Sequence, residues 1–119
     1  MLYPVFKVIS TEHSLNTITA ALEVDADSEL FSGHFPEQPV VPGACMLQTV
    51  KEILEDTFKA QLSLVKADNI KFLNRVVPGI GHLNLQINYQ VVDNQFKVAV
   101  NLTADDTVCM KLKGTFLAK

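Results

Sequence analysis

The sequence predicts an α+β domain in which one long helix covers one face of an antiparallel sheet of about six strands. Three observations support this fold class: one segment has helical periodicity, several segments alternate apolar and polar residues, and turn signals separate them. With 119 residues, of which 48% are hydrophobic, the chain can bury one core. We therefore expect a single domain that spans residues 1–119.

The helix is predicted from residue 43 to about residue 59. Its apolar side chains recur at intervals of three and four residues: Met46, Leu47, Val50, Ile53, Leu54, Thr57 and Phe58. A polar stripe lies on the other side: Gln48, Glu52, Glu55 and Lys59. Pro42 and Gly43 open this segment, and the free N–H groups and positive dipole end of a helix would lie there.

Strands are predicted on both sides of the helix. Residues 2–9 and 15–24 precede it, and residues 62–73, 80–92, 96–102 and 108–117 follow it. The alternation is sharpest between residues 83 and 91, where Leu83, Leu85 and Ile87 alternate with polar residues. Asp93-Asn94 and Ala104-Asp105-Asp106 supply hairpin turns.

Composition excludes several function classes. A net charge of −3 and a pI near 5.5 argue against a nucleic-acid protein held by a general basic field. Cys45 and Cys109 lie in apolar patterns and are expected to be buried thiols rather than a disulfide. The chain has no secretory leader, no run of eighteen apolar residues and no metal-type Cys/His spacing, so we expect a cytoplasmic protein without membrane or metal.

The loop from residue 25 to residue 42 is long and has no periodicity, which is more typical of a functional loop than of an idle one. It contains Gly33-His34-Phe35-Pro36, and three prolines in seven positions remove backbone donors from its second half. His34 therefore stands beside a helix start. Its ordinary pKa near neutrality suits proton removal, although a histidine that only fills the loop is the alternative.

The block from Gly33 to Gly43 resembles the hot-dog dehydratases that act on 3-hydroxyacyl thioesters of acyl carrier protein, because it combines Gly-His-Phe-Pro, a Pro-Val pair and Pro-Gly ahead of a long helix. The stretches Ile70-Lys71-Phe72-Leu73-Asn74-Arg75-Val76-Val77-Pro78-Gly79 and Thr107-Val108-Cys109 are similar to later parts of the same family. The resemblance implies a hot-dog fold, with the sheet wrapped around the helix. It also implies a homodimer with a continuous sheet, catalytic side chains from both subunits at each site, and dimers that can associate further.

The resemblance assigns roles to particular residues. It makes His34 the base that removes the C2 proton, and the backbone N–H of Gly43 the donor to the thioester oxyanion. Plausible walls of the acyl site are Phe31, Phe35, Pro42, Met46 and Phe72, which composition alone would read as core. Lys66, Lys71 and Arg75 would meet the phosphopantetheine phosphate or the acidic surface of the carrier protein; solvated strand charges are the alternative.

The third catalytic group, the acid, departs from the family pattern. The family has Glu or Asp five residues after the helix-opening glycine and usually Gln four residues later, whereas this chain has Gln48 and then Glu52. Residues four apart share a helix face, so we hypothesise that this pair keeps an amide and a carboxyl together and that Glu52 supplies the acid directly or through water. The alternative is that Glu52 is solvated and the site has lost its acid.

The resemblance therefore predicts dehydration of (3R)-3-hydroxyacyl-acyl-carrier-protein to the trans-2-enoyl thioester in fatty-acid or polyketide-like synthesis. The substrate would be carried on phosphopantetheine, as acyl carrier protein or acyl-CoA thioester, and no metal or redox cofactor is implied. Two alternatives stay open. One is an acyl thioesterase, although the chain lacks the His-Gly-Gly helix opening of one large thioesterase group; the other is an inactive acyl-thioester-binding subunit that needs an active partner.

Overall fold

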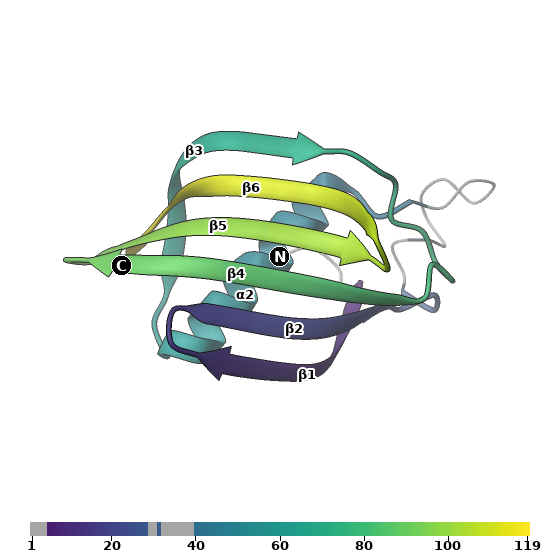
Figure 1. Ribbon diagram of the computed structural model, residues 1–119, viewed down its shortest axis with the longest axis horizontal. Coiled ribbons are helices and arrows are strands. Elements are labelled where there is room, and N and C mark those ends of the chain that lie inside the picture. Colours follow the sequence, from purple (N-terminus) through teal and green to yellow (C-terminus); the bar gives the residue numbers. More distant parts are fainter. Residues whose placement is uncertain (1–4, 29–30, 32–39) are drawn as a thin grey trace.

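The computed structural model describes residues 5–28, 31 and 40–119. They form one antiparallel sheet and one long helix, α2 (Figure 1). The element bounds are β1 Phe6–Ser14, β2 Thr17–Val24, α2 Gly43–Phe58, β3 Leu62–Phe72, β4 His82–Val92, β5 Gln95–Ala104 and β6 Thr107–Ala118. His34, Phe35 and most of the proline-rich loop lie outside the described residues.

The six strands are arranged in the order β1-β2-β4-β5-β6-β3, and every neighbouring pair is antiparallel. Figure 1 looks at the outer face of this sheet, with α2 crossing behind it. One helix against a curved six-stranded antiparallel sheet is the hot-dog arrangement, which confirms the predicted fold class.

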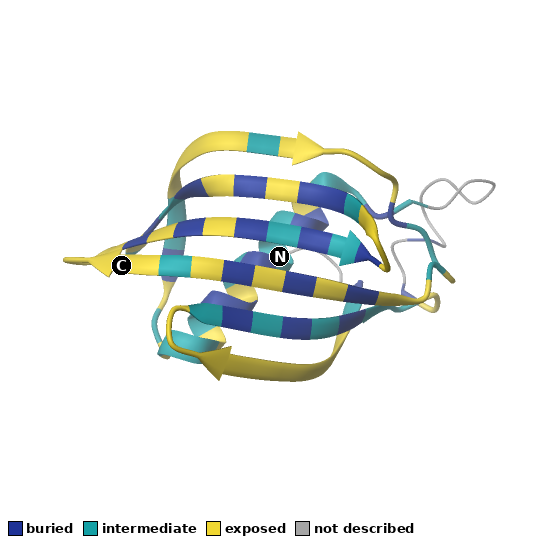
Figure 2. Ribbon diagram, viewed as in Figure 1, coloured by how far each residue is buried: buried dark blue, intermediate teal, exposed yellow. Residues whose placement is uncertain are grey.

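The core lies between α2 and the inner face of the sheet. Along β4 and β5 the burial alternates from residue to residue, which Figure 2 shows as bands. The helix contributes Cys45, Met46, Val50, Ile53 and Leu54 to this layer. The predicted stripe and the predicted alternation are both confirmed, except that Val91 is exposed at the far end of β4. The two cysteines are free and buried, as expected.

An aromatic cluster holds the C-terminal end of α2 against the sheet. The ring of Phe58 lies 5.0 Å from that of Tyr89 and 4.8 Å from that of Phe96. The Tyr89 hydroxyl donates a hydrogen bond to the carbonyl of Leu15 at 3.0 Å and is also hydrogen-bonded to the His13 ring. Beyond Phe58, Lys59 adopts a left-handed conformation with φ 52°, which ends the helix.

The first strand differs from its prediction. It runs from Phe6 to Ser14 rather than over residues 2–9, and residues 10–14, which lay between the two predicted strands, pair with β2. Because β1 is an edge strand, its polar residues pair with β2 through main-chain groups while their side chains remain in solvent. An irregularity between Val8 and Ser10 further obscures its alternation. The other elements agree with prediction to within about two residues at each end.

The strand β3 lies at the opposite edge and pairs on one side, with β6. Its ladder is interrupted between Leu64 and Lys66 and again between Ala67 and Asn69. The partner strand carries Gly114 at this point, where an added Cβ would lie 2.5 Å from the Lys66 carbonyl oxygen. The close backbone approach therefore requires glycine.

Leu54 is fully buried on the inner face of α2, whereas Leu15 is 92% exposed in the β1–β2 turn. We expect Leu54→Ala to lower the free energy of unfolding by about 2–5 kcal/mol, because it removes apolar contacts and leaves a cavity. Leu15→Ala is the matched control and should change it by less than about 0.5 kcal/mol. Urea denaturation measures both, and equal costs would contradict the packing of α2 described above.

Candidate functional site

A pocket of about 230 Å³ opens at the N-terminal end of α2. It is lined by Val40, Val41, Gly43, Met46, Phe72, Leu73, Asn74, Arg75 and Val76. Four residues singled out from the sequence thus meet here: Gly43, Met46, Phe72 and Arg75. The chain around the helix start is far in sequence from the segment after β3, and the fold brings the two together around one hollow.

Backbone hydrogen bonds fix the walls of this pocket. The N–H of Val41 donates to the carbonyl of Val76 at 2.7 Å, which joins the chain before α2 to the segment after β3. The N–H of Leu73 donates to the carbonyl of Cys109 at 2.8 Å, and the side-chain amide of Asn74 donates to the carbonyl of Val108 at 2.7 Å. Leu73, Asn74 and Val76 received no role in the sequence analysis, although they belong to the stretch that resembles the dehydratases.

The ring of Phe72, which is 51% exposed, lies against Gly43. A Cβ added at Gly43 would lie 2.5 Å from Cζ of Phe72 and 2.7 and 2.9 Å from two further ring atoms. The ring of Phe72 therefore covers the Cα side of Gly43 while it lines the pocket. The last residue of β3 and the first residue of α2 thus form one wall.

In the first turn of α2 the N–H of Cys45 donates to the Pro42 carbonyl at 3.0 Å, whereas the N–H groups of Gly43 and Ala44 have no backbone partner among the described residues. The N-cap residue is Pro42, with φ −62° and ψ 147°, and among the described residues no side chain caps this end. The first turn also carries no acidic residue. The N–H groups that every α-helix leaves free at its start, with the positive end of the dipole, are therefore available to an oxyanion.

Gln48 and Glu52 form the pair that their spacing predicted. Nε2 of Gln48 donates a hydrogen bond of 3.1 Å to Oε1 of Glu52. Glu52 is exposed and Gln48 is half-buried in the single chain. Neither side chain lines the pocket at Gly43. A single chain therefore holds the two parts of the expected site on different faces of α2.

The remaining expected residues lie in different surroundings. Phe31 is buried in the core at 9% exposure and does not line the pocket, so the structure places it with the core rather than with the acyl wall. Lys66 and Lys71 are exposed on β3, and Lys66 pairs with Asp68 at 3.4 Å. Arg75 alone among the three expected cations reaches the pocket.

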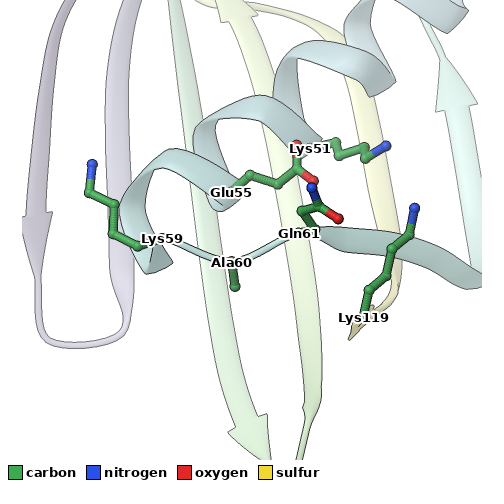
Figure 3. Close-up of a pocket in the computed structure, with 6 residues that line it drawn as sticks. All are labelled: Lys51, Glu55, Lys59, Ala60, Gln61 and Lys119. Carbon is green, nitrogen blue, oxygen red and sulfur yellow. The ribbon is translucent and has the colours of Figure 1, made fainter.

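A second hollow of about 500 Å³ lies along the C-terminal half of α2 (Figure 3). It is lined by Lys51, Glu55, Lys59, Ala60, Gln61 and Lys119. In this hollow, Oε2 of Glu55 accepts a hydrogen bond from the N–H of Leu62 at 2.9 Å. This hollow contains none of the residues of the sequence motifs and lies where α2 connects to β3.

Other chemistries have little support in the part of the chain that is described. Burial raises the pKa of the Cys45 thiol and of the Cys109 thiol, so neither is activated as a nucleophile. Within residues 5–28, 31 and 40–119, no group of three or more His, Cys, Asp or Glu side chains is arranged to hold a metal ion. Over the same ranges, no helix is both long and apolar enough to span a bilayer.

Comparison with known proteins agrees with this arrangement. A family model described as ApeI-like, ApeI dehydratase, matches residues 10–113. The chain therefore belongs to the ApeI-like family of hot-dog dehydratases. The matched residues include α2, the residues that line the pocket at its start and most of the sheet.

Two relatives are both named 3-hydroxyacyl-[acyl-carrier-protein] dehydratase FabZ. The protein from Rickettsia massiliae is 28% identical over 112 residues, which cover 87% of this chain and 77% of that protein. The protein from Listeria monocytogenes is 34% identical over 80 residues, which cover 61% of this chain and 55% of that protein.

Two solved structures share the fold. The dehydratase heterocomplex ApeI:P from Xenorhabdus doucetiae superimposes with a TM-score of 0.76 at 23% identity, covering 93% of this chain and 96% of the matched chain. The thioesterase HI1161 from Haemophilus influenzae superimposes with a TM-score of 0.62 at 15% identity, covering 96% and 78%. At these identities the likeness extends to the fold, which proteins of different activity share.

The contact between Gly43 and Phe72 can be tested by a double-mutant cycle. We expect Gly43→Ala to push the Phe72 ring out of place and to lower the free energy of unfolding by about 1–2 kcal/mol, as overpacking does. In a Phe72→Ala background the same substitution should cost less than about half as much, because the clash is gone. Thermal denaturation of the four proteins gives the coupling; equal costs in both backgrounds would refute the contact.

Proposed function

We propose that this chain dehydrates (3R)-3-hydroxyacyl groups carried on acyl carrier protein to the trans-2-enoyl thioesters. The observation that carries the proposal is the helix start at Gly43, whose first-turn N–H groups open beside an apolar pocket walled by Phe72 and Met46. The chain's family and the names of its relatives support the same reaction. We place this activity in the cytoplasm, in fatty-acid or polyketide-like synthesis.

The reaction needs three groups. A base removes a proton from C2, a donor stabilises the negative charge that develops on the thioester oxygen, and an acid protonates the hydroxyl that leaves C3. His34 is our proposed base, because it stands in the Gly-His-Phe-Pro motif that resembles the dehydratases, nine residues ahead of the helix-opening Gly43. The N–H of Gly43 is our proposed oxyanion donor, because it is fixed by the helix and reinforced by its dipole.

The Gln48–Glu52 pair is our proposal for the acid. The Gln48 amide donates a hydrogen bond of 3.1 Å to Glu52, which a carboxyl can accept in its ionised or its protonated form. The pair thus preserves both functional groups of the family pattern, with the carboxyl displaced by one helical turn. In its protonated form Glu52 would give its proton to the leaving hydroxyl directly or through one water, so that water leaves and the carboxylate is reprotonated from solvent, while Gln48 holds that hydroxyl.

The site would be completed by a second copy of the chain. In one chain the Gln48–Glu52 pair lies away from the pocket at Gly43, and Glu52 is exposed. The edge of β3 that faces away from β6 pairs with no described strand, which leaves its main-chain groups available. A homodimer joined along β3 would continue the sheet and cover these side chains, and dimers could associate further.

Two other functions have a specific observation in their favour. The exchange of the carboxyl for Gln48, with Glu52 exposed, favours an inactive acyl-thioester-binding subunit that works with an active partner. A dehydratase heterocomplex is among the proteins of the same fold. An amide that orients water near the free helix N–H groups would also suit a thioesterase, and one protein of this fold is named so.

Hydration of a short trans-2-enoyl thioester, followed by loss of its conjugated absorbance, tests the proposal. We expect the purified protein to consume the enoyl thioester without releasing thiol, and His34→Ala and Glu52→Gln to lower kcat by about 10²–10⁴-fold, as loss of a general acid or base does. Thiol release at the same rate would instead identify a thioesterase. Acyl-thioester binding without turnover would identify a binding subunit.

Restoring the usual carboxyl gives an independent test of the exchanged pair. We expect Gln48→Glu to retain or raise activity in the wild-type background and to rescue the Glu52→Gln variant, because a carboxyl and an amide are then again present on the same stripe. Lys51→Gln is the matched control on the same turn of α2 and should rescue nothing. If Gln48→Glu leaves the Glu52→Gln variant inactive, the two positions do not share one duty.

A further inference from the structure

The basic residues of this acidic chain are concentrated on three adjacent strands. The strands β3, β5 and β6 contain one acidic residue, Asp68, and five lysines: Lys66, Lys71, Lys97, Lys111 and Lys113. The whole chain has ten basic and thirteen acidic residues and a net charge of −3. Half of its basic residues therefore lie on three strands that are neighbours in the sheet.

These lysines project from the outer face of the sheet, which Figure 1 presents to the viewer. Lys97 lies between the buried residues Phe96 and Val98, and the two lysines of β6 flank buried Leu112. Because strand residues alternate between faces, these three lysines point away from the core. In β3, Lys71 pairs with Lys111 and Lys66 with Thr115, which places both on the same outer face. All five are exposed. We call them the lysine face.

The lysine face is closely spaced. Lys71 lies directly opposite Lys111, and Lys66 and Lys97 lie on either side of Thr115. Lys66, Lys97 and Lys113 line a shallow hollow of about 450 Å³, and Lys111 and Lys113 line another of about 170 Å³. Like charges directly opposite on neighbouring strands destabilise a sheet. The Lys71–Lys111 pair is therefore a cost that the fold alone does not explain.

Little negative charge offsets this concentration. Lys66 forms an ion pair with Asp68 at 3.4 Å. Over the described residues, no ion pair involves Lys71, Lys97, Lys111 or Lys113. Four uncompensated positive charges thus remain on a face that no other part of the described chain covers, which is the charge pattern that a negatively charged partner requires.

The lysine face also adjoins the candidate active site. Lys71 is on the outer face of β3, and the next residue, Phe72, lines the pocket at Gly43. Arg75 continues the positive charge to the pocket itself. A negatively charged protein that bound here would sit beside β3, whose last residue lines the pocket, from where a flexible arm could deliver an acyl group.

We propose that the lysine face is the docking surface for the acidic protein that carries the acyl thioester, with Lys97, Lys111 and Lys113 as its centre. The inference rests on the proposed function. It extends the expected carrier contact from Lys66, Lys71 and Arg75 to the outer face of β5 and β6. Discrete charges separated by neutral residues such as Asn101 and Thr115 suit carboxylates on a folded protein.

A pair of charge reversals separates docking from chemistry. We expect Lys111→Glu with Lys113→Glu to raise KM for an enoyl group on acyl carrier protein by at least about tenfold, through lost electrostatic complementarity. The same variant should process the enoyl group on pantetheine within about twofold of wild type, because the pocket is untouched. The carrier effect should shrink at about 0.5 M salt, which screens exposed charges.

Lys59→Glu with Lys119→Glu is the matched control. It changes the net charge by the same amount, at exposed positions of the other hollow (Figure 3). We expect it to leave both substrates unaffected. An equal rise in KM for the carrier-bound substrate in both variants would overturn the docking surface, because net charge alone would then explain the effect. No rise in either variant would overturn it too.

Direct binding keeps the inference testable if the protein proves inactive. Titration with acyl carrier protein should give a saturable signal for wild type and the control variant, and at least about tenfold weaker binding for the Lys111→Glu and Lys113→Glu variant. Failure of turnover with this binding pattern would reject the proposed reaction and retain the docking surface. Wild-type protein that binds anionic lipid vesicles or duplex DNA but not acyl carrier protein would reject the docking surface.

Discussion

A single helix has to cover the inner face of a six-stranded sheet, and most other features of this protein follow from that constraint. Apolar residues on successive turns of α2 fill the space above β2, β4, β5 and β6, where the sheet is most completely buried. One helix is too narrow to reach both edges and both ends. The edge strands β1 and β3 therefore remain mostly exposed, and the pocket opens where the helix begins.

The same constraint explains why the candidate site lies at Gly43. At this point the helix axis approaches the end of β3 so closely that the Phe72 ring occupies the space a side chain at Gly43 would need. The contact fixes the first turn of α2 while leaving its N–H groups unblocked. The Phe72 ring thus contacts the first residue of the helix and also forms part of the pocket wall.

The sequence predicted the fold well because its strongest signals are periodic. The helix was predicted from residue 43 to about 59 and runs from Gly43 to Phe58, since its apolar stripe is unbroken. The first strand was misplaced because an edge strand needs no apolar face, so Ser10, Thr11 and Glu12 resemble a turn. The pairing of Gln48 with Glu52 followed from helical spacing, whereas the lysine face did not, because it joins residues from three strands whose order only the sheet reveals. His34 and Phe35 stay predictions from the motif.

The two irregularities in the ladder of β3 have a consequence for which other strands this edge can accept. A regular edge strand offers evenly spaced main-chain groups to any extended peptide and is a common start of aggregation. In β3 the breaks at Leu64/Lys66 and Ala67/Asn69 twist the strand and disturb that spacing. An unrelated extended peptide could therefore pair in register with β3 over only a few residues. A strand whose own irregularities match those of β3 could pair along its whole length.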